Sequence, residues 1–156
     1  MADERPEQRL EQAGIMLPQP PSAVASYAPA VLDGDLLLIS GQLPFREAGI
    51  ERTGLVGDAV TLEEAQQDAS VAAVNALAVA KRELGELSRV RRVLRLVCYV
   101  AATPDFTGHP KVANGASEVM TLAFGDNGRH ARAAVGCASL PLGAAVEVEL
   151  MLRVQP

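Results

Sequence analysis

Three charged residues near the C-terminus could do chemistry together. Arg132 stands near the start of an apolar stretch, and Glu147 and Glu149 alternate with apolar residues in the next one. An arginine in apolar surroundings is costly unless an anion meets it, and its planar fork of N–H donors suits a carboxylate held by two hydrogen bonds. The pattern predicts a site for a small carboxylate ligand, with a glutamate nearby to handle a proton or a water molecule.

Each of these residues also has a structural interpretation that the sequence leaves open. Arg132 could be a surface arginine that pairs with a carboxylate such as Glu147. Because side chains alternate along a strand, Glu147 and Glu149 point to the same side, which could be a solvent-facing strand edge. His130, two residues before Arg132, fits a surface loop, and its role stays open.

Two separated motifs resemble the RidA/YjgF family. The first is Arg-x-x-Val at 132–135, followed by Leu-Pro at 140–141 and Val-Glu-Val-Glu at 146–149. The second is Tyr27 followed by Ser-Gly-Gln-Leu-Pro at 40–44. The resemblance covers nearly the whole chain after Tyr27. It implies an α+β, chorismate-mutase-like fold that assembles as a homotrimer, with sites at the subunit interfaces.

The resemblance also implies roles for individual residues. Several members of the family deaminate reactive enamines and imines. The matching arginine, Arg132, would bind the carboxylate of the substrate, and the backbone carbonyl of Ala134 would contact the substrate nitrogen. Glu147 would hold and polarise the attacking water. The other residues that the resemblance assigns to the pocket are Tyr27, Ser40, Gly41 and Asn114.

From these residues we predict hydrolytic deamination of a 2-aminoacrylate-like or 2-imino acid to a 2-keto acid and ammonia. No Cys/His/Asp cluster has metal-ligand spacing, and we predict no metal and no cofactor. One alternative is a non-catalytic protein that binds a 2-keto acid or a related metabolite through Arg132. Another is an endoribonuclease or translation inhibitor. The net charge of −5 and the scarcity of aromatic residues count against a nucleic-acid partner, since RNA binding needs clustered cations and stacking rings.

The elements that must position these residues follow from local patterns. A capping box from Thr61 to Glu64 begins a helix with helical apolar spacing, and Gly85 ends it. The order β-β-α-β-α-β-β predicts one mixed sheet with two helices on one face. The second helix is predicted over 110–124, and strands are predicted over 25–31, 36–40, 90–101, 131–139 and 145–154, the first two joined as a hairpin through Asp33-Gly34-Asp35.

The stretch 90–101 is apolar on both sides, so we expect one face toward a helix and the other toward a partner subunit. The residues assigned to one face are Leu94, Leu96, Cys98 and Val100, and those assigned to the other are Val93, Arg95, Val97 and Tyr99. The segment 45–59, which is rich in glycine, is predicted to be a long loop.

The length of 156 residues suits one domain, which we place at 25–156 after an N-terminal extension at 1–24. The N-terminus is charged and lacks the apolar core of a signal peptide, and no apolar run is long enough to span a bilayer. Cys98 and Cys137 have no paired spacing and fit buried free thiols, which suits a reducing compartment. We therefore expect a cytoplasmic protein without membrane contact.

Overall fold

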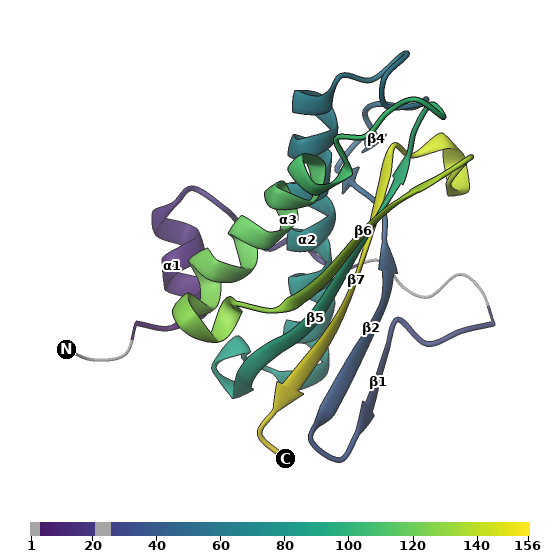
Figure 1. Ribbon diagram of the computed structural model, residues 1–156. Helices are drawn as coiled ribbons and strands as arrows, with labels where there is room; N and C mark the ends of the chain where they lie inside the picture. The colour runs from purple at the N-terminus through teal and green to yellow at the C-terminus, as the bar shows by residue number, and fades with distance from the viewer. Residues whose placement is uncertain (1–3, 21–25) are drawn as a thin grey trace.

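The computed structural model describes residues 4–20 and 26–156, which form a sheet with helices packed on one face (Figure 1). The helices are α1 (Pro6–Gln12), α2 (Leu62–Leu84) and α3 (His109–Phe124), with short 3₁₀ turns η1 (Leu87–Arg89), η2 (Gly125–Gly128) and η3 (Pro141–Gly143). The strands are β1 (Ala30–Asp33), β2 (Leu36–Gln42), β3 (Phe45–Arg46), β4 (Gly49–Ile50), β5 (Val90–Ala101), β6 (Ala131–Cys137) and β7 (Val146–Val154).

The main sheet has five strands in the order β1-β2-β7-β5-β6. β5 and β6 run parallel, and the other neighbouring pairs are antiparallel. The predicted mixed α+β sheet is therefore confirmed. A parallel pair needs a crossover connection, and α3 supplies it between β5 and β6. As a result β6, the strand that carries Arg132, lies at one edge of the sheet next to α3.

The long helix α2 begins and ends where the sequence predicts. The Thr61 hydroxyl accepts a hydrogen bond from the backbone N–H of Glu64 at 3.2 Å, and the Glu64 carboxylate accepts one from the Thr61 N–H at 2.9 Å. Gly85 ends the helix with a φ of 84°. Its alanine-rich face lies close to α3, because a Cβ on Gly115 would be 2.0 Å from the carbonyl oxygen of Gln66.

The short helix α1 packs against the rest of the fold although it lies in the predicted N-terminal extension. Leu10 has no exposed surface and belongs to the hydrophobic core. The Glu7 carboxylate accepts a hydrogen bond of 2.7 Å from the backbone N–H of Leu87 in η1. The first helix is thus held against α3 and against η1, the turn that precedes β5.

Two local predictions differ from the structure. The first strand begins at Ala30 and not near Ala25, which lies outside the described residues, and Tyr27 lies in a bend before the strand. Pro29 has no N–H to donate to a ladder, which explains the late start. The loop predicted over 45–59 contains the small β3–β4 hairpin, in which Phe45 pairs with Ile50.

The predicted faces of β5 are wrong at the start of the strand. Val93 is fully buried in the core beside Leu96, although the alternation assigned these two residues to opposite faces. The β5–β7 register shifts between Val93 and Arg95, and such a bulge inserts an extra residue that reverses the alternation. From Arg95 onward the faces are as predicted, with Leu96, Cys98 and Val100 in the core.

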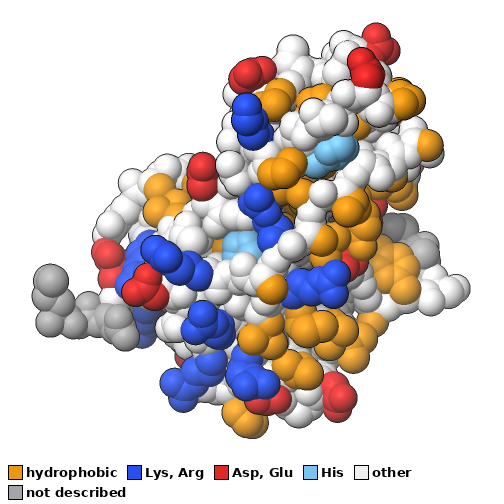
Figure 2. Space-filling model, viewed as in Figure 1, with side chains coloured by type: hydrophobic (Ala, Val, Ile, Leu, Met, Phe, Trp, Pro, Cys, Tyr) orange, Lys and Arg blue, Asp and Glu red, His pale blue; other side chains and the backbone are white. Residues whose placement is uncertain are grey.

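The sheet face turned away from α2 and α3, which we call the open face, is partly apolar (Figure 2). Val31, Leu38 and Val135 expose 41–53% of their surface there. Cys137 is half-buried and not fully buried as predicted, whereas Cys98 is inside the core. Among the described residues, no helix is long and apolar enough to cross a membrane.

Candidate functional site

Arg132 lies on β6 with its side chain directed toward α3. Its Nη1 donates hydrogen bonds to Asn114 Oδ1 at 2.9 Å and to Ser117 Oγ at 3.1 Å. Its Nη2 donates to the Pro110 carbonyl oxygen at 3.3 Å. All three acceptors are neutral, and no carboxylate of the described residues forms an ion pair with this arginine. The interpretation in which Arg132 pairs with Glu147 is therefore wrong for this chain.

The guanidinium of Arg132 keeps donors for a ligand. It carries five N–H groups, and these three hydrogen bonds use two from Nη1 and one from Nη2. The described residues provide no partner for the remaining N–H groups on Nε and Nη2. Donors on these neighbouring nitrogens match the two oxygens of a carboxylate, and the side chain is exposed to solvent. Asn114, which the sequence places near this site, helps to hold the cation in place.

Glu147 lies on β7, where it alternates with the buried residues Val146 and Val148 and so faces the open side of the sheet. Its carboxylate rests against Gly41 of β2, because a Cβ on Gly41 would lie 1.9 Å from Oε1. Burial raises the pKa of Glu147, and the charge of Glu149 raises it further. A carboxylate with a raised pKa is a better proton acceptor when it is ionised.

Arg132 and Glu147 lie on opposite faces of the sheet. Arg132 is in register with Leu96, a core residue that faces the helices. Glu147 is in register with Tyr99, which also lies on β5. Tyr99 comes three residues after Leu96, and because side chains alternate along a strand, Tyr99 and Glu147 lie on the face opposite to Leu96 and Arg132. β5 also separates the two strands that carry them. A single chain does not bring these two residues together, and this could not be foreseen because the strand registers were unknown.

Tyr27, Ser40 and Gly41 lie on the Glu147 side. The Ser40 hydroxyl donates a hydrogen bond of 2.7 Å to the Ala28 carbonyl and so fixes the segment next to Tyr27 beside β2. Tyr27 itself is 54% exposed. Ser40 and Gly41 occupy an irregularity of β2, where the register with β7 shifts between Ile39 and Gln42. Ala134 lies on the Arg132 side, partly buried against the core.

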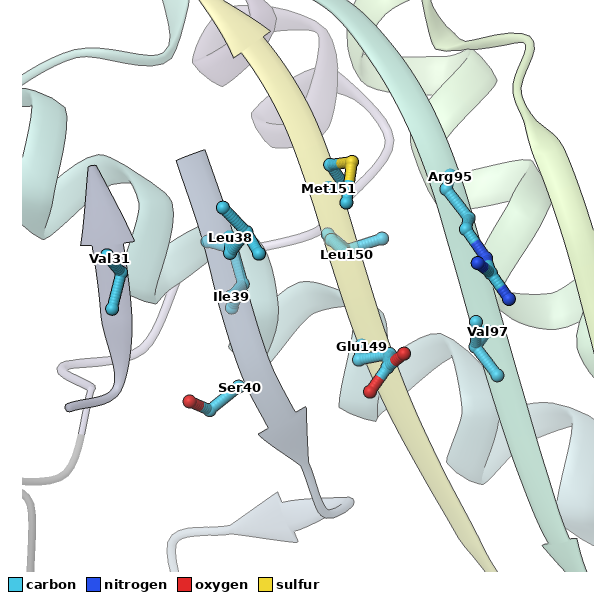
Figure 3. Close-up of a pocket in the computed structure, with 9 residues that line it drawn as sticks. All are labelled: Val31, Leu38, Ile39, Ser40, Arg95, Val97, Glu149, Leu150 and Met151. Atoms are coloured by element: carbon cyan, nitrogen blue, oxygen red, sulfur yellow. The ribbon is translucent and has the colours of Figure 1, made fainter. Parts of the chain in front are cut away.

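A shallow groove of about 340 Å³ crosses the open face next to these residues (Figure 3). Its walls include Val31, Leu38, Arg95, Glu149 and Met151. In the close-up, the Arg95 side chain lies above Val97 on β5, and the Glu149 side chain lies beside Val97 on the neighbouring strand β7 (Figure 3). The pKa of Tyr99 is raised first by burial and then by the nearby Glu149 carboxylate. The groove is mainly apolar, with one charge of each sign.

Sequence reasoning missed Ser117, which contacts Arg132, and left open the role of His130, which contacts Ser117. Ser117 accepts a hydrogen bond from Arg132, and its Oγ lies 3.0 Å from Nε2 of His130. The other ring nitrogen of His130, Nδ1, lies 2.6 Å from the Gly128 carbonyl oxygen. The spacing of Ser117 by three from Asn114 on one helix face was the available signal. No three His, Cys, Asp or Glu side chains within 4–20 and 26–156 gather as metal ligands.

Comparisons with known proteins agree with this architecture. Residues 7–154 match the family model described as "YjgF/chorismate mutase-like, putative endoribonuclease". Protein TCP17 of Trypanosoma cruzi is 41% identical over 145 residues, which cover 92% of this chain and 91% of that protein.

Two solved structures extend the comparison. An Agrobacterium tumefaciens protein of unknown function is 44% identical, with a TM-score of 0.91 over 96% of this chain and 92% of that one. RidA from an Antarctic Psychrobacter bacterium is 30% identical, with a TM-score of 0.60 over 87% of this chain and 94% of that one. The Agrobacterium structure thus matches the backbone of this chain more closely than RidA does.

Proposed function

Because this chain belongs to the YjgF/RidA family, we propose that it hydrolyses a small 2-imino acid, or the enamine that tautomerises to it, to a 2-keto acid and ammonia. The observation that carries the proposal is the state of Arg132. Its guanidinium is fixed by three neutral acceptors and keeps N–H donors toward solvent. A cation held in this way is suited to bind an anionic ligand such as a carboxylate.

The proposed reaction is substrate binding followed by addition of water to the imine carbon and loss of ammonia from it. Arg132 binds the substrate carboxylate, and the Ala134 carbonyl accepts a hydrogen bond from the substrate nitrogen. Glu147 takes a proton from a water molecule, whose oxygen attacks the imine carbon as the C=N electrons move to nitrogen. Glu147 returns this proton to the nitrogen, which gives a tetrahedral carbon that carries one hydroxyl and one amino group. Glu147 then moves the hydroxyl proton to the amino nitrogen, so that the C=O bond forms as the C–N bond breaks and ammonia leaves. General-base help of this kind typically contributes about 10²–10⁴-fold.

The proposed site needs two copies of the chain. Since Arg132 and Glu147 face opposite sides of one sheet, we propose that Arg132 and Ala134 of one protomer meet Glu147, Gly41, Ser40 and Tyr27 of its neighbour in a homotrimer. The exposed apolar residues of the open face support such an assembly, because association would remove them from water.

A coupled assay tests the proposal. An amino-acid lyase or oxidase generates the 2-imino acid in situ, and imine loss is followed with and without this protein. We expect clear acceleration by the wild-type protein. Arg132→Ala should lower kcat/KM by about 10²-fold or more, since two charge-assisted hydrogen bonds to the substrate are lost.

The matched control is Arg129→Ala. This arginine is highly exposed, and among the described residues its only ion pair is with the exposed Asp126. This variant should retain full activity. If several imino acids show no acceleration while 2-keto acids still bind through Arg132, the protein is a non-catalytic binding member of the fold.

A further inference from the structure

A series of hydrogen bonds runs from Arg132 through Ser117 of α3 and His130 to the η2 turn. Arg132 Nη1 contacts Ser117 Oγ at 3.1 Å, and that oxygen lies 3.0 Å from His130 Nε2. His130 Nδ1 lies 2.6 Å from the carbonyl oxygen of Gly128. Ser117 and His130 are both half-buried, whereas Arg132 is exposed. These hydrogen bonds therefore connect the solvent-exposed guanidinium of Arg132 to the backbone carbonyl of Gly128.

The far end of this series is held rigidly. Gly128 is buried, and a Cβ at this position would lie 2.2 Å from the carbonyl oxygen of Met120 on α3. The η2 backbone is thus in direct contact with the helix that also carries Ser117. Both ends of the His130 ring are consequently tied to one packed unit.

The Gly128 carbonyl oxygen only accepts, so Nδ1 of His130 donates to it. When Nδ1 carries the only proton of the ring, Nε2 is an acceptor and the Ser117 hydroxyl donates to it. The Ser117 oxygen accepts a hydrogen bond from Nη1 of Arg132.

We propose that Ser117 and His130 are positioning residues that hold the Arg132 guanidinium with its Nε and second Nη2 donors directed at the ligand carboxylate. The inference deepens the proposed function and rests on it for the identity of the ligand. An exposed arginine samples many rotamers, and binding a planar anion with two hydrogen bonds requires one of them. Because Ser117 already holds Nη1 before the ligand arrives, the Arg132 side chain loses less conformational entropy when the ligand binds.

Two substitutions break this series at neighbouring links. Ser117→Ala removes the hydroxyl that joins Arg132 to His130. His130→Asn keeps a donor for the Gly128 carbonyl but has no atom at the position of Nε2. We expect each to raise KM for the imino acid and Kd for pyruvate by about 3- to 10-fold with little change in kcat, which corresponds to one lost hydrogen bond. Ser117→Thr, which restores a hydroxyl, should recover most of the affinity.

The matched control is Thr121→Ala, one turn further along α3. The Thr121 hydroxyl donates to the carbonyls of Ser117 and Glu118 in its own helix, so its loss should leave KM and Kd unchanged. A nitrogen–proton NMR spectrum of the arginine side chains gives a second readout. The Arg132 Nη1 signals should be sharp and slowly exchanging in the wild type and in Thr121→Ala, because Nη1 is hydrogen-bonded, and should broaden in Ser117→Ala and His130→Asn.

The outcomes separate this inference from the proposed function. If the wild type shows no deaminase activity but Ser117→Ala weakens pyruvate binding and broadens the Arg132 signals, the positioning role stands and the reaction is wrong. If Ser117→Ala and His130→Asn leave KM, pyruvate affinity and the Arg132 signals as in the wild type, the positioning role is overturned whatever the activity.

Discussion

Glu147 differs from an ordinary surface carboxylate because burial and the nearby Glu149 both raise its pKa. Arg132 differs from an ordinary surface arginine because its partners are a side-chain amide, a hydroxyl and a backbone carbonyl. The residue types alone predicted a cation for a carboxylate and a base for water. The neutral partners of Arg132 could not be predicted fully, because Pro110, Asn114 and Ser117 belong to α3 and only the folded β6–α3 contact brings them to Arg132.

The raised pKa of Glu147 predicts how activity depends on pH. A general base must be ionised, so kcat/KM should fall as pH is lowered through this raised pKa. Glu149→Gln removes the like charge that contributes to the shift. The pKa of Glu147 should then fall, and the acid limb of the profile should move to lower pH. The measurement is kcat/KM against pH for both proteins, and an unmoved or upward-shifted limb in Glu149→Gln would contradict the role of Glu147.

At the scale of elements, local signals predicted the helices better than the strands. The capping box at Thr61 and the stop at Gly85 are short-range features, and α2 follows them closely. Strand starts and faces depend on pairing partners that are distant in the sequence. Pro29 delayed β1, and the bulge after Val93 reversed the faces of β5. The same lack of register information hid the placement of Arg132 and Glu147 on opposite faces.

The close contact of α2 and α3 predicts a specific cost for one added methyl group. In Gly115→Ala the new Cβ would lie 2.0 Å from the Gln66 carbonyl oxygen, so the helices must separate. We expect a loss of about 1–3 kcal/mol in the free energy of unfolding. Lys111→Ala, at an exposed position of the same helix, is the control and should change stability by less than about 0.5 kcal/mol. Equal stability of Gly115→Ala and the wild type in urea denaturation would refute the close packing.

At the scale of the whole molecule, the helices cover one face of the sheet, and no described helix covers the open face. It combines exposed Val31 and Leu38 with the charged pair Arg95 and Glu149 along one groove. The family resemblance predicted a homotrimer, and the chain's membership of that family supports the proposal. The opposite placement of Arg132 and Glu147 gives a separate physical reason for assembly, since the proposed site is incomplete within one chain.

A charge on the open face should disrupt the proposed trimer. Leu38→Glu would have to bury a carboxylate against the apolar groove, which is costly without a partner. We expect light scattering to show a trimer for the wild type and smaller species for Leu38→Glu, with activity lost in proportion. Leu122→Glu places the same charge at an exposed leucine of α3 and should remain trimeric. A monomeric wild-type protein at micromolar concentration would rule out the assembly.

Subunit mixing tests the shared site most directly. Arg132→Ala and Glu147→Ala proteins, each expected to be inactive, are unfolded together in equal amounts, refolded and assayed for imine hydrolysis. If each site takes Arg132 from one protomer and Glu147 from its neighbour, about one site in three of each mixed trimer regains both residues. Mixed trimers make up about three quarters of a random population, so activity returns to about a quarter of the wild-type level. Refolded mixed trimers without activity, formed from variants that are each inactive alone, would contradict the account.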